Sequence, residues 1–450
     1  MKNRSFYIFA LSLALPSIIQ QLVTNVSQLV DNFMVGKLNE VSISGVSIAN
    51  QVFFIFTVVV LGLSAAGGIF ISQYRGAQND EKVTEVFRVV LIFNIITGII
   101  FFLLMNIIPE KILYLFTEDK ATVAIAMTYM GYIKYTFLIY SIAIAISGSF
   151  RYCGLVKVSM YIAIISVLTN VFFNYCFIYG NLGFPNMGVS GAGLATLIAR
   201  IVEVVIAIGL AKVLDTPIKT RIKDMFKFER FILKNYITRG YGLVINEFFW
   251  AFGIQMTNVI FTQRISSNIA ALSIANAMIN LIFIGMGGMS VAISIIVGKS
   301  LGKSNFEQAK VDSKKLLKLS AFVGQSLGII ILIVSYVITG FYEISDSTRS
   351  MARLIITIAA CFSWLYYLNT SSFFTLRAGG DTKSVLLMDS GFMWVISIPI
   401  AFLFGVLHLY MPLHYFLVQL LDLLKLVVAR HRYRKGVWLN NLTIHKQNNA

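Results

Sequence analysis

The tetrapeptide Ser47-Ile-Ala-Asn50 occurs a second time as Ser273-Ile-Ala-Asn276, at a separation of 226 residues (273 − 47). Other identical residues keep this separation without a gap: Gly62 and Gly288, Ser64 and Ser290, Gly76 and Gly302, Asn79 and Asn305, Glu81 and Glu307, Arg151 and Arg377, Lys157 and Lys383. A register kept over about a hundred residues indicates a tandem duplication. The unit is too long for a solenoid repeat, so we expect it to form a lobe.

The composition is that of a membrane protein. Apolar residues make up 57% of the chain, charged residues 13%, and the mean hydropathy is +0.79. A soluble domain has about 25% charged and 45–50% apolar residues. The 3 cysteines show no paired or CxxC spacing, and the 4 histidines form no metal-ligand pair inside the membrane. We therefore expect no cofactor, no disulfide and no metal beyond a coupling cation.

Twelve stretches are long and apolar enough to span a bilayer, which needs about 20 mostly apolar residues. They are 8–35, 46–72, 86–108, 122–148, 156–179, 189–213, 240–263, 269–298, 316–338, 350–374, 384–407 and 409–428. Each repeat carries six, and an even number inserts both repeats in the same orientation. We expect an all-α integral membrane protein of twelve transmembrane helices, with an N-lobe at 1–213, a linker at 214–239, a C-lobe at 240–428 and a tail at 429–450.

The basic residues predict the orientation. They concentrate at 219–234, 310–318 and 430–435, on the side that the positive-inside rule assigns to the cytoplasm. Both termini, the linker and the tail are then cytoplasmic, and the protein belongs to the cell (inner) membrane. The alternative for these runs is an acidic-lipid or nucleic-acid patch; we favour topology and expect no nucleic-acid partner. Segment 214–238 is amphipathic and predicts an interfacial helix.

A polar stripe runs along the first span. Its members, at steps of three and four residues, are Ser17, Gln20, Thr24, Gln28 and Asp31. This spacing puts all five on one helical face, which faces a cavity or another helix and not lipid. Asn170 and Asn174 lie one turn apart on the fifth span, and Thr196 lies near the start of the sixth. Together, the carboxylate of Asp31, the two asparagines and the Thr196 hydroxyl predict a small-cation or proton site in the outer half of the membrane. A polar helix-packing network is the alternative.

Other ionisable residues within the spans are candidates because charges at membrane depth are costly. Arg200 and Glu203 are three residues apart and are expected to neutralise each other. Lys134 is solitary, and its role stays open. Asp389 is expected near water at the end of its span, and Asp422 and Lys425 lie toward the end of the last span.

Glu247 gives the second repeat its own acidic span, and Asn276 and Asn280 on the next span are candidates to face it. We expect Glu247 to line the cavity and to attract organic cations. The sequence contains no P-loop lysine motif, no GxSxG and no HExxH, so we expect neither direct ATP coupling nor an enzyme.

With these residues in place, the chain resembles the multidrug and toxic compound extrusion (MATE) family of cation-coupled antiporters over nearly its whole length. The stretches that carry the resemblance are Gln28-Leu-Val-Asp-Asn-Phe-Met-Val-Gly36, Gln73-Tyr-Arg-Gly76, Arg151-Tyr-Cys-Gly154, Asn170 to Tyr175, Gly188-Val-Ser-Gly-Ala-Gly-Leu-Ala-Thr196, Gly298-Lys-Ser-Leu-Gly302 and Leu376-Arg-Ala-Gly-Gly-Asp-Thr-Lys383. Each is weak alone, and the set in this order is specific.

The resemblance implies two six-helix lobes in a V around a central cavity, exporting amphipathic, often cationic compounds against inward Na⁺ or H⁺ flow. The cation site of some prokaryotic members falls on Asp31, Asn170, Asn174 and Thr196. Asn174 departs from that pattern, which has an acid there. Other members use acids on the seventh and tenth spans; Glu247 matches the seventh, whereas the tenth carries Tyr366, Tyr367 and Asn369. We assign Gln28, Glu247, Asn276 and Tyr367 to the substrate cavity.

Two rival functions are weighed against the antiporter. A flippase for lipid-linked substrates would line its cavity with several Arg or Lys for a pyrophosphate, and mid-span cations are few. An integral-membrane enzyme such as an acyltransferase needs a His or acid dyad at the interface, and the sequence shows none. We therefore expect a monomeric antiporter whose partners are small organic substrates, a monovalent cation (H⁺ or Na⁺) and the lipid bilayer.

Overall fold

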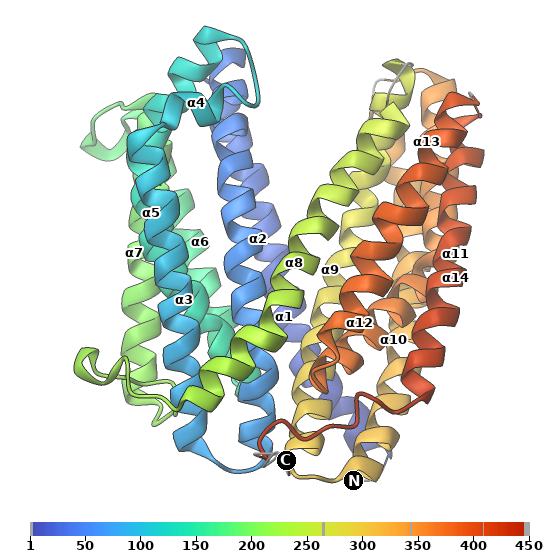
Figure 1. Ribbon diagram of the computed structural model, residues 1–450. Coiled ribbons are helices and arrows are strands. Elements are labelled where there is room, and N and C mark those ends of the chain that lie inside the picture. The colour runs from blue at the N-terminus through green and yellow to red at the C-terminus, as the bar shows by residue number, and fades with distance from the viewer. Residues whose placement is uncertain (1–2, 263–265, 343, 408, 445–450) are drawn as a thin grey trace. The chain divides into compact units, whose positions relative to one another are not determined.

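A computed structural model describes residues 3–262, 266–342, 344–407 and 409–444, and in these ranges the regular structure is helical (Figure 1). Twelve helical stretches are long and apolar enough to cross a membrane, as the sequence predicts. The ends of the expected seventh span (at residue 263) and tail (445–450) lie outside the described residues. The helices of the first repeat are α1 (Asn3–Gly36), α2 (Glu40–Gly76), α3 (Asp80–Ile107), α4 (Pro109–Leu113), α5 (Lys120–Tyr152), α6 (Val156–Tyr179), η1 (Asn181–Gly183) and α7 (Gly188–Val213).

The second repeat follows the same order. Its elements are α8 (Arg230–Thr262), α9 (Ser266–Gly302), α10 (Phe306–Ile338), η3 (Thr339–Phe341), α11 (Asp346–Ala378), α12 (Thr382–Leu386), the π-helical turns η4 (Leu387–Gly391) and η5 (Met393–Ser397), α13 (Ile398–Val406) and α14 (Met411–Arg434). The 226-residue register is confirmed in these bounds: α9 starts and ends 226 residues after α2, and α11 starts and ends 226 residues after α5.

The turns between equivalent helices are also built alike. Asn79 caps α3 by accepting from the Lys82 amide at 3.1 Å, and Asn305 caps α10 by accepting from the Gln308 amide at 3.0 Å. The residues before these caps, Gln78 and Ser304, both take positive φ (57° and 56°). A capping amide satisfies backbone N–H groups that would otherwise lack partners at the start of a helix. The repeat therefore preserves the signals that start each helix.

The helices pack into two compact units. Unit 1 comprises Met1–Ile18, Ser72–Gln78 and Tyr241–Ala450, and unit 2 comprises Ile19–Ile71 and Asn79–Gly240. In unit 2, α5 packs against α3, α6 and α7, and its core contains an aromatic cluster. The members of that cluster are Phe53, Phe56, Phe101, Phe137 and Tyr140. In unit 1, the equivalent helix α11 packs against α9, α10 and α14.

The segment between the repeats is not the helix that its amphipathic pattern predicts. Within 214–238 the structure has one short 3₁₀ turn, η2 (Ile222–Asp224), before α8 begins at Arg230. Tertiary contacts lie on both sides of this turn: Thr84 on α3 donates to the Pro217 carbonyl at 2.8 Å, and Arg88 on α3 donates to the Lys227 carbonyl at 2.6 Å. These side-chain bonds satisfy backbone carbonyls in place of helical bonds.

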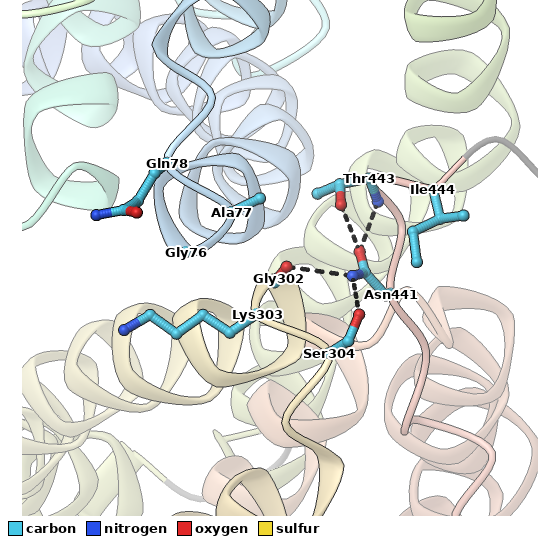
Figure 2. A pocket seen from close by; sticks show the side chains of 9 residues that line it. All are labelled: Gly76, Ala77, Gln78, Gly302, Lys303, Ser304, Asn441, Thr443 and Ile444. Carbon is cyan, nitrogen blue, oxygen red and sulfur yellow. Dashed lines mark hydrogen bonds between the residues drawn. The ribbon is translucent and has the colours of Figure 1, made fainter.

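The chain after α14 folds back onto unit 1. Trp438 is buried and stacks on Tyr433, and the buried Gln73 side chain accepts from the Leu442 amide at 2.7 Å. Figure 2 shows the Asn441 side chain meeting the turn after α9, where it donates to the Gly302 carbonyl at 3.1 Å and to Ser304 Oγ at 2.8 Å. Residues 435–444 are therefore an ordered part of unit 1.

The end of α2 meets the end of α9 at two glycines that are equivalent in the repeat. A Cβ on Gly76 would lie 2.2 Å from the Lys299 carbonyl oxygen, and a Cβ on Gly302 would lie 1.9 Å from the Gln73 carbonyl oxygen. Both obstacles are backbone atoms, which cannot rotate away. The contact therefore requires glycine on both sides, as in other close helix crossings within membranes.

We expect Gly302→Ala to lower the free energy of unfolding by about 3 kcal/mol or more, because the added methyl group forces the two backbones apart. Gly209→Ala is the matched control: nothing lies within 4 Å of a Cβ there, and alanine favours the helix. Thermal unfolding of both purified variants checks this. Equal stability of the two variants would contradict the proposed close crossing.

Candidate functional site

Asp31 on α1 is bound by the two asparagines of α6. The Asn174 amide nitrogen donates to Asp31 Oδ1 at 2.5 Å. Both atoms of the Asn170 amide find hydrogen-bond partners when the nitrogen faces the carboxylate. The nitrogen then donates to Asp31 Oδ1 at 2.8 Å, and the oxygen accepts from the Thr196 hydroxyl at 3.3 Å. The four residues predicted for the cation site are thus brought together from three helices.

Local sequence explains why these side chains meet. Asn170 and Asn174 are four residues apart, so they share one face of α6. The glycines at the start of α7 let that helix approach closely: a Cβ on Gly191 would lie 2.6 Å from the Phe177 carbonyl oxygen of α6, and one on Gly193 would lie 2.8 Å from the Tyr129 carbonyl oxygen of α5. This close packing places Thr196, which also lies on α7, within hydrogen-bond distance of Asn170.

A second charge pair lies on the same helix as Thr196. Arg200 forms an ion pair with Glu203 at 2.6 Å, which confirms the predicted neutralisation, and Ser166 of α6 donates to Glu203 at 3.2 Å. The guanidinium also lies over the Tyr140 ring, with the ring centroid 4.4 Å away, and interacts electrostatically with Asp31. Two carboxylates and one guanidinium leave the network with one net negative charge.

The network has the chemistry of a monovalent-cation or proton site. A carboxylate, amide oxygens and a hydroxyl are ligands for a hard cation, and a proton removes the same charge. The carbonyl oxygen of Asn174, a residue only 1% exposed, accepts no hydrogen bond from the described residues. An orphaned buried acceptor beside a carboxylate fits a bound cation or proton donor. The coupling role of the four residues stays a prediction.

The other polar residues of the first repeat lie outside this network. Gln28 is exposed and, among the described residues, makes no hydrogen bond to Asp31. Lys134 donates to Asn106 Oδ1 on α3 at 3.0 Å and lies beside the Tyr135 ring, so its partner is an amide. The stripe along α1 therefore contributes Asp31 alone to the hydrogen-bonded network, and the role of Gln28 in the cavity stays a prediction.

Glu247 on α8 forms an ion pair with Arg377 on α11 at 2.7 Å. The arginine side chain is 7% exposed and the glutamate side chain 28%. Arg377 also lies over the Phe374 ring, with the centroid 4.6 Å away. The sequence shows Arg377 as part of the repeat but does not predict this pair, because the two residues are far apart in the chain. The pair neutralises the Glu247 carboxylate in this state.

The remaining cavity assignments have other contacts. Asn276 donates to Asn258 of α8 at 3.4 Å, and no contact with Glu247 is seen in the described part of the chain. Tyr367 is fully buried, donates to the Ile282 carbonyl at 2.8 Å and packs against Gly324. It therefore holds α11 against α9 and α10. Contact of either residue with substrate stays a prediction.

Asp389 corrects an expectation. It was expected near water, but it is 9% exposed and lies inside unit 1, where it accepts from Asn246 of α8 at 3.1 Å and faces Lys425 of α14. The sequence carried a signal for this contact, namely an acid and a base on the last two spans. It gave no indication that the two spans would bring them together.

Comparison with known proteins supports the fold and the family. The sequence pattern of the MatE family matches residues 16–176 and again 244–403, once in each repeat. The chain is 23% identical to the "Probable multidrug resistance protein YoeA" of Bacillus subtilis (strain 168), covering 89% of this chain and 86% of that protein. It is 24% identical to the "Probable multidrug resistance protein NorM" of Thermotoga maritima, covering 87% and 84%.

Solved structures show the same fold. "Crystal structure of MATE in the bent conformation" superposes with a TM-score of 0.85 at 18% identity, covering 99% of this chain and 100% of that one. A transporter from Pyrococcus furiosus superposes with a TM-score of 0.83 at 19% identity, covering 95% and 96%. Its title says that the reverse polarity of its binding pocket suggests a different function. Identities this low establish the fold alone.

We expect Glu247→Gln to destabilise the protein by about 3 kcal/mol, because it leaves the buried Arg377 guanidinium without a counter-charge. The double variant Glu247→Gln with Arg377→Gln removes both charges and should recover most of that loss. Thermal unfolding of the single and double variants gives the coupling between them. Additive losses would show that the ion pair contributes no stability.

Proposed function

Because the chain belongs to the MatE family, a family of multi-pass membrane transporters and not of enzymes, we propose that it exports small organic compounds, amphipathic or cationic, in exchange for inward-moving protons. The two relatives described above are named as probable multidrug resistance proteins, which supports this class of substrate. The proposal assigns coupling to Asp31 and alternating access to the two halves of the chain.

The observation that carries the proposal is the half-buried Asp31, bound by two buried asparagines in a network with one net negative charge. An ionised, unpaired carboxylate in a membrane span pays a large desolvation cost, and a proton or cation relieves it. If the relief differs between outward-open and inward-open states, ion binding changes the balance between them. A difference of about 1.4 kcal/mol changes that balance tenfold, and full switching needs about 5.5 kcal/mol.

The residues around Asp31 favour H⁺ over Na⁺. Asn174 supplies an amide where a second acid would strengthen cation binding, and it is already within hydrogen-bond distance of Asp31. We therefore propose H⁺ as the coupling ion, with Na⁺ as a weak competitor.

A lipid or lipid-linked-saccharide flippase is the alternative function, and the charge pairs weigh against it. Such a substrate needs free arginines or lysines for its phosphates. In this structure Arg200, Arg377 and Lys425 each lie against carboxylates. A pyrophosphate would have to displace those partners, whereas an organic cation would not. Transport of a cationic dye and of a lipid-linked pyrophosphate by the same proteoliposomes separates the two functions.

We expect Asp31→Asn to mimic the protonated state. The protein should fold, insert and bind substrate, while export driven by a pH gradient falls at least tenfold. The measurement is dye efflux from proteoliposomes with imposed pH and Na⁺ gradients applied separately. Glu118→Gln is the control, because it removes an exposed carboxylate outside the helices. Wild-type export by Asp31→Asn would remove Asp31 from coupling.

Asn174→Asp should add the charge that is missing from the sodium-binding pattern of the family. Two carboxylates in contact disfavour double ionisation, so the site should hold its proton to higher pH and should bind Na⁺ more tightly. In the same proteoliposomes, export by this variant is expected at higher pH and with a Na⁺ gradient alone. An unchanged pH profile together with no response to Na⁺ would refute the assignment of position 174.

A further inference from the structure

Unit 1 contains a second group of buried charges that the proposed mechanism does not use. The Lys425 ammonium on α14 lies 3.4 Å from Asp422 Oδ1 and 3.7 Å from Asp389 Oδ1. The three side chains are 9%, 22% and 12% exposed, respectively. Both distances exceed those of a close charge-assisted hydrogen bond, about 2.7–2.9 Å. The lysine is therefore shared between two carboxylates and holds neither tightly.

Neutral polar groups complete this triad of Asp389, Asp422 and Lys425. The Asn246 amide of α8 donates to Asp389 Oδ2 at 3.1 Å, and the Asn369 amide of α11 donates to the Asp422 carbonyl at 3.0 Å. Asn369 is 4% exposed, and its side-chain oxygen accepts no hydrogen bond from the residues that the structure describes. A buried acceptor without a donor, on a side chain that bonds the backbone of Asp422, is what a proton-carrying site would contain.

The backbone at Asp389 departs from the repeat. Asp389 and Ser390 lie in the π-helical turn η4, where Ser390 donates to the Asn246 backbone carbonyl at 2.8 Å. The residues 226 positions earlier, 161–165, lie in the uninterrupted α-helix α6. π-Turns are rare and frequently occur at functional sites, because the extra residue turns side chains to a new direction. The turn is therefore found at the buried acid and not at the equivalent residues of the first repeat.

The charges of the triad determine which ligand it takes. Two carboxylates and one ammonium leave one net negative charge inside a membrane span, where such a charge is costly. A metal cation among these groups would lie next to the Lys425 ammonium, which repels it. A proton on one carboxylate neutralises the group without adding a second cation. We propose that Asp389 and Asp422 share one bound proton, held beside Lys425.

The neighbouring titratable groups described here do not compete with Asp389 and Asp422 for the proton. On α8 and α11, Glu247 and Arg377 pair with each other. The phenols of Tyr366 and Tyr415 interact with Asp422, and phenols stay neutral over the range in which carboxylates titrate. The triad is separate in residues from the Asp31 network. Any part it takes in coupling would rest on the proposed antiport, whereas proton binding itself does not.

Infrared difference spectroscopy tests the proposal, because it detects carboxyl groups that become protonated. Purified protein in detergent is measured between about pH 9 and pH 6, where exposed carboxylates stay ionised. Asp389→Asn and Asp422→Asn should each lose one protonated carboxyl per chain, because the remaining acid is balanced by Lys425. Lys425→Met should have the opposite effect and gain one, because two acids then lack a counter-charge. Asp31→Asn is the control and should keep the band of the triad.

If the triad had only a structural role, the asparagine variants and the Lys425→Met variant would not change the number of protonated carboxyl groups in opposite directions. Should an asparagine variant fail to fold, Asp422→Glu keeps the carboxyl and should retain the band at a shifted position. An unchanged band in both asparagine variants, or a loss of the band in Lys425→Met, would overturn the proposal. Because the measurement involves no transport, that result would leave the proposed function standing, and failure of the Asp31→Asn efflux test would leave this site standing.

Discussion

The absence of water inside a bilayer is the constraint on which this structure depends. Backbone groups there must pair within their own segment, so the chain forms long helices. A charged side chain must likewise find a counter-charge, an amide or a proton. Arg200, Arg377 and Lys425 each lie against carboxylates drawn from their own unit. The polar networks are therefore a consequence of the environment as much as candidates for function.

Duplication preserved the helical frame but not the two networks with excess carboxylate. The caps at Asn79 and Asn305 and the glycines at 76 and 302 are shared between the repeats, because they start helices or allow close approach. The charged networks use different positions: Asp31 with two asparagines in one repeat, and Asp389 with Lys425 in the other. Each network nevertheless has one net negative charge. Packing limits glycine and cap positions strictly, whereas a charge can be balanced from several helices.

A site with one net charge suits a transporter that couples an ion gradient to a conformational change. The free-energy difference between ion-bound and ion-free states is large only when the uncompensated charge is buried. A fully neutral pair, such as Glu247 with Arg377, gains little from binding a proton and mainly stabilises the fold. The excess of carboxylate over base therefore separates the networks that can carry coupling from those that hold helices together.

The sequence by itself determined the helical class, the twelve spans, the 226-residue repeat and the family, because hydrophobic length and periodicity are local properties. It also identified Asp31, Asn170, Asn174 and Thr196 as one group, since helical spacing and the resemblance both pointed to them. Only the tertiary structure decided that Arg377 neutralises Glu247, that Asp389 is buried beside Lys425, and that segment 214–238 is mostly not helical. These outcomes depend on which helices pack together, and no local pattern encodes the partner of a charge on another helix.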